Sequence, residues 1–302
     1  MLEFQKWFWN YQSVKVVSHP VLLITPVYAD HHAKMKFLKT SEIFIRKGLD
    51  HLYARWPQSM PTEERLRQCK IIAHRGDYDN QDIFENTVAA FDRASAGSVW
   101  GIEFDLRWTK DLHPVVNHDD HLRRVFGMEV NIHQVTLAEI QSKCPLVPSL
   151  AEVISRFGQK MHLMIEIKSE VYPDPIRQNR ILADLLAALQ PVEDYHFLSM
   201  TPQMFNLIDC VPRNAFLPVA HFNFFRLSKM AIEQNYSGIA GHYVLLTRSR
   251  LKRHKTFMQN LATGYVNSKN CLFRELNRGV EWIFSDNAVA LQKIVNQLLQ
   301  ND

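Results

Sequence analysis

The stretch Lys70-Ile71-Ile72-Ala73-His74-Arg75-Gly76 is a short apolar run that ends in ionisable side chains. The same design recurs at Gly101-Ile102-Glu103-Phe104-Asp105, at Val115-Val116-Asn117-His118-Asp119 and at Ile165-Glu166-Ile167-Lys168. Each apolar run predicts a strand, and each places charged groups where that strand stops. These stretches therefore predict strands with polar ends.

Strand-like and helical patterns alternate from Lys70 to the end of the chain. Eight strand-then-helix units in this length predict a parallel (β/α)8 TIM barrel. A doubly wound open sheet is the alternative, but no GxGxxG motif follows the first strand. The predicted strands are 70–74, 100–106, 161–167, 195–200, 214–220, 236–241, 261–266 and 279–284. The predicted helices are 85–96, 149–157, 176–189, 202–209, 226–235, 247–259, 270–278 and 287–300.

One apolar run does not fit the strand count. Pro114 to His118 follows the second strand after only a few residues, whereas a parallel crossover needs about a dozen. We therefore predict an antiparallel hairpin that folds back over the mouth of the barrel. Residues 106–148 become an excursion between the second and third barrel strands.

Residues 1–68 form a helical N-terminal extension in this interpretation, and residues 69–302 form the barrel. An apolar stripe that includes Phe44, Leu49 and Tyr53 predicts an amphipathic helix over 34–55, ending near Trp56-Pro57. The opposite face carries Lys36, Lys39, Arg46 and Lys47. Docking on the barrel and binding to a membrane surface both remain open for this helix.

The bulk composition excludes some classes of protein. A net charge of +4 without a nucleic-acid-binding motif does not indicate nucleic acid as a partner. Four separated cysteines give no zinc or disulfide pattern and favour a reducing, cytoplasmic location, with a peripheral membrane association as an option. The apolar run from Val16 to Ala29 leaves secretion open.

The acidic strand ends predict a metal site. Glu103 and Asp105 are two residues apart, so alternation along a strand places both carboxylates on one side. Glu166 and Lys168 repeat this geometry on the next barrel strand, and the carboxyl ends of barrel strands converge on one mouth. Carboxylates so close together repel one another unless a cation lies among them, and oxygen ligands favour one Mg²⁺ or Ca²⁺ over zinc.

Two histidines are predicted to reach the same mouth from different segments. His74 ends the first strand and His118 lies on the hairpin, so one could take a proton while the other gives one. Arg75 and Lys168 supply positive charge for phosphate oxygens. Glu85 could bind a substrate hydroxyl, hold Arg75, or simply favour the start of the following helix.

Two other segments have weaker signals. The basic run from Thr247 to Lys255 is typical of a solvated helix face, with a lipid-headgroup patch as the sharper hypothesis. The aromatic residues at 221–225 could line the substrate mouth or pack in the core.

The order HRG, ENT, ExD, TKD, VVxHD and IEIK resembles the glycerophosphodiester phosphodiesterase family, from about Lys70 to the end. The resemblance implies a (β/α)8 barrel, metal ligation by Glu103, Asp105 and Glu166, and acid/base chemistry by His74 and His118. It also implies that Arg75, Glu85 and Lys168 contact substrate.

This chain departs from the family pattern at several positions. Phe84 replaces a common proline, Leu112-His113 replaces a glycine turn, and Tyr265 lies where a tryptophan is common. Ser285-Asp286 replaces a threonine-aspartate pair. None of these departures removes a catalytic group, and the change at Tyr265, together with the aromatic segment 221–225, bears on headgroup specificity.

The leading hypothesis is a metal-dependent hydrolase that cleaves glycerophosphodiesters to glycerol 3-phosphate and an alcohol. A lysophospholipase D-like enzyme acting on a lysolipid is the first alternative. The second is a non-catalytic barrel that binds headgroups at a membrane, although binding alone does not need two titrating histidines.

Overall fold

The computed structural model describes residues 48, 51–221 and 223–300. The chain divides into two compact units, residues 1–49 and 50–302, and the second contains the barrel. Most of the helix predicted over 34–55 lies outside the described residues. Its last turn is helical at residues 51–55 and ends before Trp56 and Pro57, as predicted.

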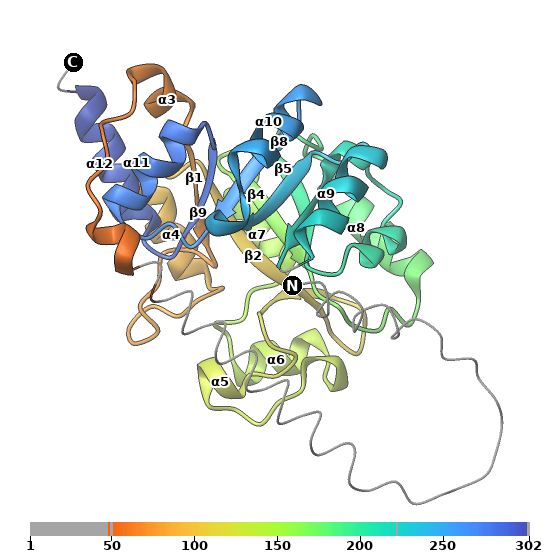
Figure 1. Cartoon of the computed structure of the whole chain (residues 1–302). Helices are drawn as coiled ribbons and strands as arrows, with labels where there is room; N and C mark the ends of the chain where they lie inside the picture. Colours follow the sequence, from red (N-terminus) through yellow and green to blue (C-terminus); the bar gives the residue numbers. More distant parts are fainter. Residues whose placement is uncertain (1–47, 49–50, 222, 301–302) are drawn as a thin grey trace, which may run out of the picture. The chain divides into compact units, whose positions relative to one another are not determined.

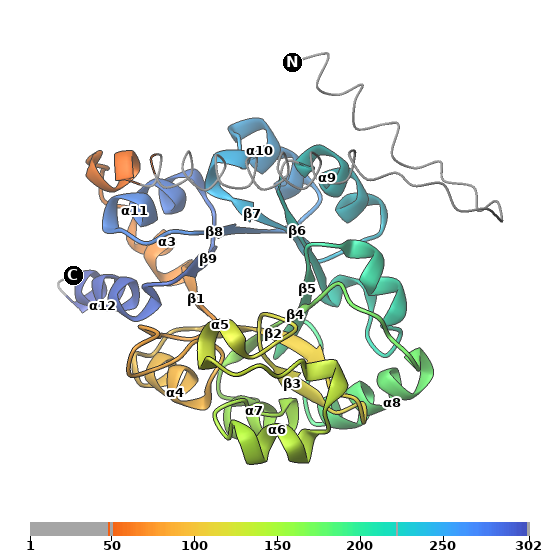
Figure 2. The same cartoon turned by 90° about the horizontal axis from the view of Figure 1, so that it is seen from below.

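Eight parallel strands form a closed barrel, which confirms the predicted fold class. The strand order is β1-β9-β8-β7-β6-β5-β4-β2, and pairing of β1 with β2 closes the ring (Figure 2). Each predicted strand is present, and its bounds differ from the predicted ones by at most three residues. The strands are β1 (Lys70–His74), β2 (Gly101–Trp108), β4 (His162–Ile167), β5 (Tyr195–Ser199), β6 (Phe216–Ala220), β7 (Gly238–His242), β8 (Asn260–Gly264) and β9 (Trp282–Ser285).

Helices surround the barrel on its outer side (Figure 2). They are α3 (Glu63–Gln68), α4 (Val88–Ala96), α7 (Leu150–Phe157), α8 (Pro175–Leu186), α9 (Phe224–Glu233), α10 (Arg248–Thr256), α11 (Lys269–Arg278) and α12 (Ala288–Gln300). Short 3-10 turns are η3 (Pro202–Leu207), η4 (Arg213–Ala215) and η5 (Tyr243–Leu245). None of the helices among the described residues is long and apolar enough to cross a membrane.

Two predicted helices need correction. The segment predicted as an α-helix over 202–209 is instead the short 3-10 helix η3, which begins at Pro202. The helix predicted from Glu85 begins only at Val88, because Asn86 has a left-handed φ of 58° and Thr87 caps the helix. Glu85 therefore lies in a turn before the helix.

The hairpin prediction is confirmed. Strand β3 (Pro114–Val116) pairs antiparallel with the last residues of β2, and Leu106 faces Val116. The excursion continues through α5 (Arg123–Phe126), η2 (Ile132–Gln134) and α6 (Leu137–Lys143). It has its own small core around Val115, Leu122 and Ile140 and lies at one end of the barrel (Figure 1).

Side-chain alternation separates an inner from an outer core. Inward-facing residues such as Ile72, Met164 and Phe284 form a cluster inside the barrel. Their neighbours Ile71 and Ile165 belong to the larger cluster that also holds residues of the outer helices. Because inward positions alternate, the register continues from this inner cluster to polar side chains at the carboxyl ends of the strands.

Residues 51–68 pack on α11 and η5. The Tyr53 ring lies 5.6 Å from that of Tyr243, and the Arg274 guanidinium stacks 4.2 Å from the Tyr53 ring. Asn270 Nδ2 donates to the carbonyl of Ala54 at 2.8 Å, and Leu66 is buried. This part of the N-terminal extension is thus docked, while the membrane alternative for residues 34–47 lies outside the described residues.

Candidate active site

Three carboxylates meet at the carboxyl ends of β2 and β4. Strand register places Asp105 beside Glu166, and oxygens of Glu103, Asp105 and Glu166 lie within 4.8 Å of one another. Glu103 and Asp105 are only 2% and 1% exposed. The sequence predicted this grouping from the two-residue spacing on neighbouring strands.

Two cations partly balance these acids. Lys168 Nζ lies 2.6 Å from Asp105 Oδ1 and 2.9 Å from Glu166 Oε1. Arg75 Nε lies 3.3 Å from Asp105 Oδ2, and the Arg75 backbone N–H donates to Glu103 Oε2 at 3.0 Å. The predicted substrate residues Arg75 and Lys168 therefore lie directly beside the acidic cluster.

The pKa values of the three acids shift in different directions in this environment. Burial and the charges of Asp105 and Glu166 raise the pKa of Glu103, and burial also raises the pKa of Glu166. Burial would raise the pKa of Asp105 as well, but Lys168 and Arg75 hold it below its usual range. A further positive charge would be stabilised among these carboxylates.

This donor set fits a divalent cation. All three side chains offer oxygen atoms, which hard cations such as Mg²⁺ and Ca²⁺ prefer. Burial first, and then the neighbouring carboxylates, raise the pKa of Glu103, so its charged form would be favoured by a bound cation. The residues present are thus suited to hold the metal that the sequence predicts.

His74 lies at the end of β1, beside the acidic cluster. Its Nε2 is 4.0 Å from Glu103 Oε2, and its Nδ1 is 2.7 Å from Asp286 Oδ1. Asn267 in turn holds Asp286, by donating from Nδ2 to Oδ2 and by accepting from the Asp286 backbone N–H. Burial alone would lower the pKa of His74, but Glu103 and Asp286 outweigh it and raise that pKa.

His118 reaches the mouth from the hairpin. Its Nδ1 lies 2.7 Å from Asp119 Oδ1, and its carbonyl accepts two hydrogen bonds from Arg107, at 3.1 and 2.7 Å. Burial lowers the pKa of His118, and the attraction of Asp105 does not overcome it. The pKa values of the two histidines are therefore shifted in opposite directions.

Glu85 holds Arg75, which was one of its predicted roles. Arg75 Nη1 donates to Glu85 Oε1 at 2.9 Å. Arg124 of the excursion donates to both oxygens of Glu85, at 3.0 and 2.7 Å, and also contacts Asp119 Oδ2 at 2.5 Å. Arg124 thus links the Arg75 side of the site to the partner of His118.

The loop after β1 depends on its glycine. Gly76 has a φ of 85°, and a side-chain Cβ there would lie 2.7 Å from Cβ of Ala90. Arg75 also has a left-handed φ of 57°, a conformation that costs free energy for a side chain of this size. Both features bring the backbone N–H of Arg75 to Glu103.

Sequence reasoning missed several residues of this network. Asn86 donates to Asp105 Oδ2 at 2.7 Å from inside the ENT motif. The Asn86 and Asp119 roles could have been suspected from their motifs, and Asp286 from the closing SD pair. No motif marks Arg124 or Asn267, because Arg124 reaches Glu85 across 39 residues and Asn267 reaches Asp286 across 19.

The departures from the family pattern have structural consequences. Leu112 adopts a φ of 61°, so a leucine occupies a turn position that favours glycine. The Tyr265 ring lies 6.2 Å from the His74 ring, at the mouth. In the segment 221–225, Phe224 is buried and Phe225 is 72% exposed, so core packing and surface exposure both occur there.

Comparison with known proteins shows which family part of the chain resembles. Residues 74–208 match the model of the Glycerophosphoryl diester phosphodiesterase family. A "Glycerophosphodiester phosphodiesterase" of Caldanaerobacter subterraneus is 34% identical over 139 residues, which are 42% of this chain and 54% of that protein. The chain spans about half the length of the curated relatives it matches first.

Solved structures share the fold. A glycerophosphodiester phosphodiesterase from Thermotoga maritima has a TM-score of 0.61 at 19% identity, covering 75% of this chain and 98% of that one. An Oleispira antarctica phosphodiesterase in complex with the product sn-glycerol-3-phosphate has a TM-score of 0.60 at 20% identity, covering 75% and 96%. Residues 74–208 are thus similar to the glycerophosphoryl diester phosphodiesterase family, and the closed barrel is the fold of the solved structures named here.

Proposed function

We propose that this protein hydrolyses glycerophosphodiesters to glycerol 3-phosphate and an alcohol. One observation carries the proposal. Two histidines whose pKa values are shifted in opposite directions lie beside one acidic cluster at the barrel mouth. A pair of titratable groups whose environments push their pKa values apart is suited to general acid and base roles. The relatives named above, and the product bound to the Oleispira protein, support this substrate class.

The chain's own residues suggest how the reaction proceeds. Neutral His118 accepts the proton of the oxygen that attacks phosphorus, and Asp119 fixes its orientation through Nδ1. Charged His74 gives its proton to the oxygen of the departing alcohol, so one P–O bond forms as another breaks. Arg75 and Lys168 attract the phosphate oxygens and orient the diester.

Glu103, Asp105 and Glu166 would hold one divalent cation, which we propose to be Mg²⁺ or Ca²⁺. Such an ion would polarise the phosphate and stabilise the charge that develops on its oxygens.

A lysolipid is a second candidate substrate. Exposed apolar side chains lie on the connections after β4, β5 and β7 or in the first turns of the helices α8 and α9, and the strands β4 to β7 are neighbours in the barrel. Val171 is 82% exposed, Ile176 77% and Phe225 72%, and Met200 and Val244 continue the arc. An acyl chain whose headgroup occupies the site could rest on this apolar rim.

The experiment is an assay of glycerophosphocholine and lysophosphatidylcholine with Mg²⁺, with Ca²⁺ and with chelator. We expect chelator to abolish activity, and Glu103→Gln and Asp105→Asn to remove both activity and divalent-ion binding measured by calorimetry. Glu152→Gln, an exposed acid on α7, is the matched control.

Full turnover in excess chelator would overturn the metal site. Absence of turnover on every diester with either metal would overturn the proposed function. A preference for lysophosphatidylcholine that Phe225→Ser reduces would favour the second candidate.

A further inference from the structure

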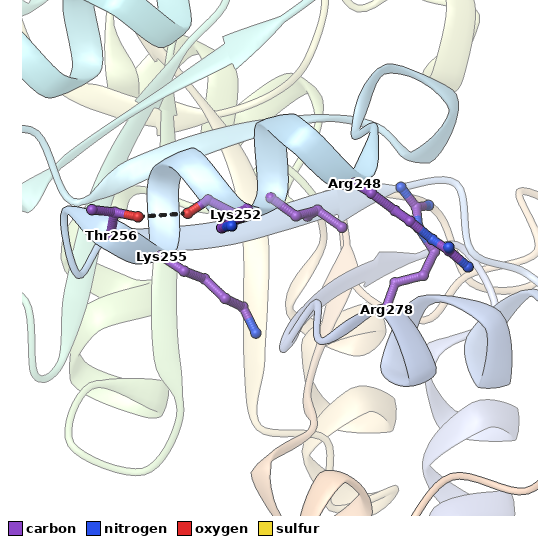
Figure 3. Close-up of a pocket in the computed structure, with 6 residues that line it drawn as sticks. Arg248, Lys252, Lys255, Thr256 and Arg278 are labelled. Atoms are coloured by element: carbon purple, nitrogen blue, oxygen red, sulfur yellow. Dashed lines mark hydrogen bonds between the residues drawn. The ribbon is translucent and has the colours of Figure 1, made fainter.

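A basic pocket lies on the outer side of the barrel, between α10 and α11 (Figure 3). Its volume is about 470 Å³. The side chains that line it are Arg248, Leu251, Lys252, Lys255, Thr256 and Arg278. None of these residues belongs to the candidate active site, and the proposed function does not use the pocket.

Most of the positive charge in this pocket has no counter-charge among the described residues. Arg248, Lys252 and Lys255 are exposed, and no ion pair of the described part of the chain includes them. Arg278 Nη1 binds Glu275 at 2.8 Å, but that carboxylate is 0% exposed and also binds Arg274. Because cations gathered in one pocket repel one another, the pocket favours an anionic group.

Two apolar side chains extend beyond the basic helix. Phe257 is 54% exposed and Met258 is 95% exposed, directly after the last turn of α10. They lie on the connection from α10 to the start of β8, hence on the face opposite the mouth. Exposed apolar side chains next to exposed lysines are typical of surfaces that contact anionic membranes.

From these contacts we infer that the pocket binds the phosphate group of an anionic lipid headgroup, while Phe257 and Met258 contact the apolar part of the same membrane. Arg248, Lys252, Lys255 and Arg278 surround the phosphate, and the hydroxyl of Thr256 lies beside them. When the face that carries Phe257 and Met258 lies on the membrane, the mouth at the opposite end of the barrel faces water. Substrates then reach the site from solution.

The test measures binding of the full chain to vesicles of phosphatidylcholine with and without phosphatidylglycerol, by sedimentation at low and high salt. Basic residues near an anionic surface strengthen binding to it, so Lys252→Glu/Lys255→Glu should weaken binding at least roughly tenfold. The matched control is Lys143→Glu/Lys293→Glu, which makes the same charge change at exposed sites on α6 and α12. Phe257→Ser/Met258→Ser should weaken binding without any change of charge.

The inference is supported if binding needs phosphatidylglycerol and if the pocket variant loses more affinity than its control. It is overturned if wild-type protein does not sediment with anionic vesicles, or if both double variants bind equally. Competition by millimolar inorganic phosphate for the pocket, with vesicle binding unaffected by the pocket variant, would assign the pocket to free phosphate and overturn the lipid. Turnover of a soluble diester should be unchanged in every variant, so failure of the proposed function is detected separately.

Discussion

His74 and His118 are the same residue type, yet their surroundings shift their pKa values in opposite directions. The carboxylates of Glu103 and Asp286 raise the pKa of His74 despite its burial. Burial lowers the pKa of His118, although Asp105 acts against it. His74 therefore keeps its proton to a higher pH than His118 does.

This difference predicts a bell-shaped pH dependence of kcat/KM. Activity should fall on the acid side as His118 gains a proton, at a pH below the ordinary histidine value of 6.5. It should fall on the alkaline side as His74 loses its proton, at a pH above 6.5. His74→Ala and His118→Ala should each lose roughly 10²–10⁴-fold in kcat while the fold is retained.

The measurement is a pH–rate profile of wild type and of both variants, with circular dichroism to check folding. Loss of only the acid limb in His118→Ala would support the assignment. Wild-type kcat in His118→Ala would assign the hairpin to substrate binding or to structure instead.

At the scale of elements, the excursion between β2 and β4 supplies groups that the barrel strands cannot. It delivers His118 and Asp119 on the chain that continues from β3, and Arg124 from α5. Arg124 contacts both Glu85 and Asp119, so it couples the excursion to the loop after β1. We interpret Arg124 as a positioning residue, since it acts through Glu85 and Asp119.

Arg124→Ala should lower kcat about tenfold, because Asp119 and Glu85 lose the cation that holds them. The neighbouring variant Arg123→Ala is the control, since Arg123 pairs with exposed Glu129 away from the site. Steady-state kinetics decide the outcome, and Arg124→Lys should restore part of the lost activity. Equal kinetics of Arg123→Ala and Arg124→Ala would contradict a positioning role.

A second pair of histidines lies inside the barrel at the opposite end. His162 Nε2 lies 2.8 Å from His196 Nδ1, and His196 Nε2 lies 3.0 Å from the hydroxyl of Ser237. The His162 ring also stacks on Trp100 at 4.2 Å. Burial lowers the pKa of His162 to about 4 and that of His196 to about 3, so both are neutral in the folded protein.

These histidines should make the barrel sensitive to acid. Their pKa values are lower in the folded than in the unfolded chain, so their contribution to stability is full above about pH 6.5 and is lost as pH falls toward 4 and 3. For His162 alone, the loss is on the order of 3 kcal/mol. Urea unfolding between pH 7.5 and pH 4.5 measures it, and His162→Gln/His196→Gln should flatten the pH dependence. An unchanged slope in that variant would contradict this origin.

At the scale of the whole molecule, residues 51–68 act as part of the barrel. Tyr53 packs between Tyr243 and Arg274, and Asn277 Nδ2 donates to the carbonyl of Ser59 at 2.8 Å. A chain that begins at residue 69 should therefore unfold more easily than one that begins at residue 50. The difference should be several kcal/mol, because buried Leu66 alone contributes about 2 kcal/mol.

Urea unfolding of the two shortened chains tests this prediction, with vesicle sedimentation of the full chain testing the membrane role predicted for residues 34–55. Equal stability of the two shortened chains would show that the contacts of residues 51–68 do not stabilise the barrel. The full chain failing to sediment with anionic vesicles would leave docking as the role of that segment.

The sequence by itself determined the barrel, the hairpin and the position of the acidic cluster. These features follow from local periodicity and from the rule that parallel strand ends meet at one mouth, so Glu103, Asp105 and Glu166 needed no long-range information. Side chains two residues apart on a strand point to the same side of the sheet. The same logic placed His74 and His118 near the cluster.

Only the tertiary structure decided which residues orient those groups. Asp286 reaches His74 across 212 residues because β9 pairs with β1 when the barrel closes. Arg124 contacts Glu85, which is 39 residues away, only once the excursion lies against the loop after β1. The pKa values of the two histidines depend on burial and on these distant partners, and such properties exist only once the chain is folded.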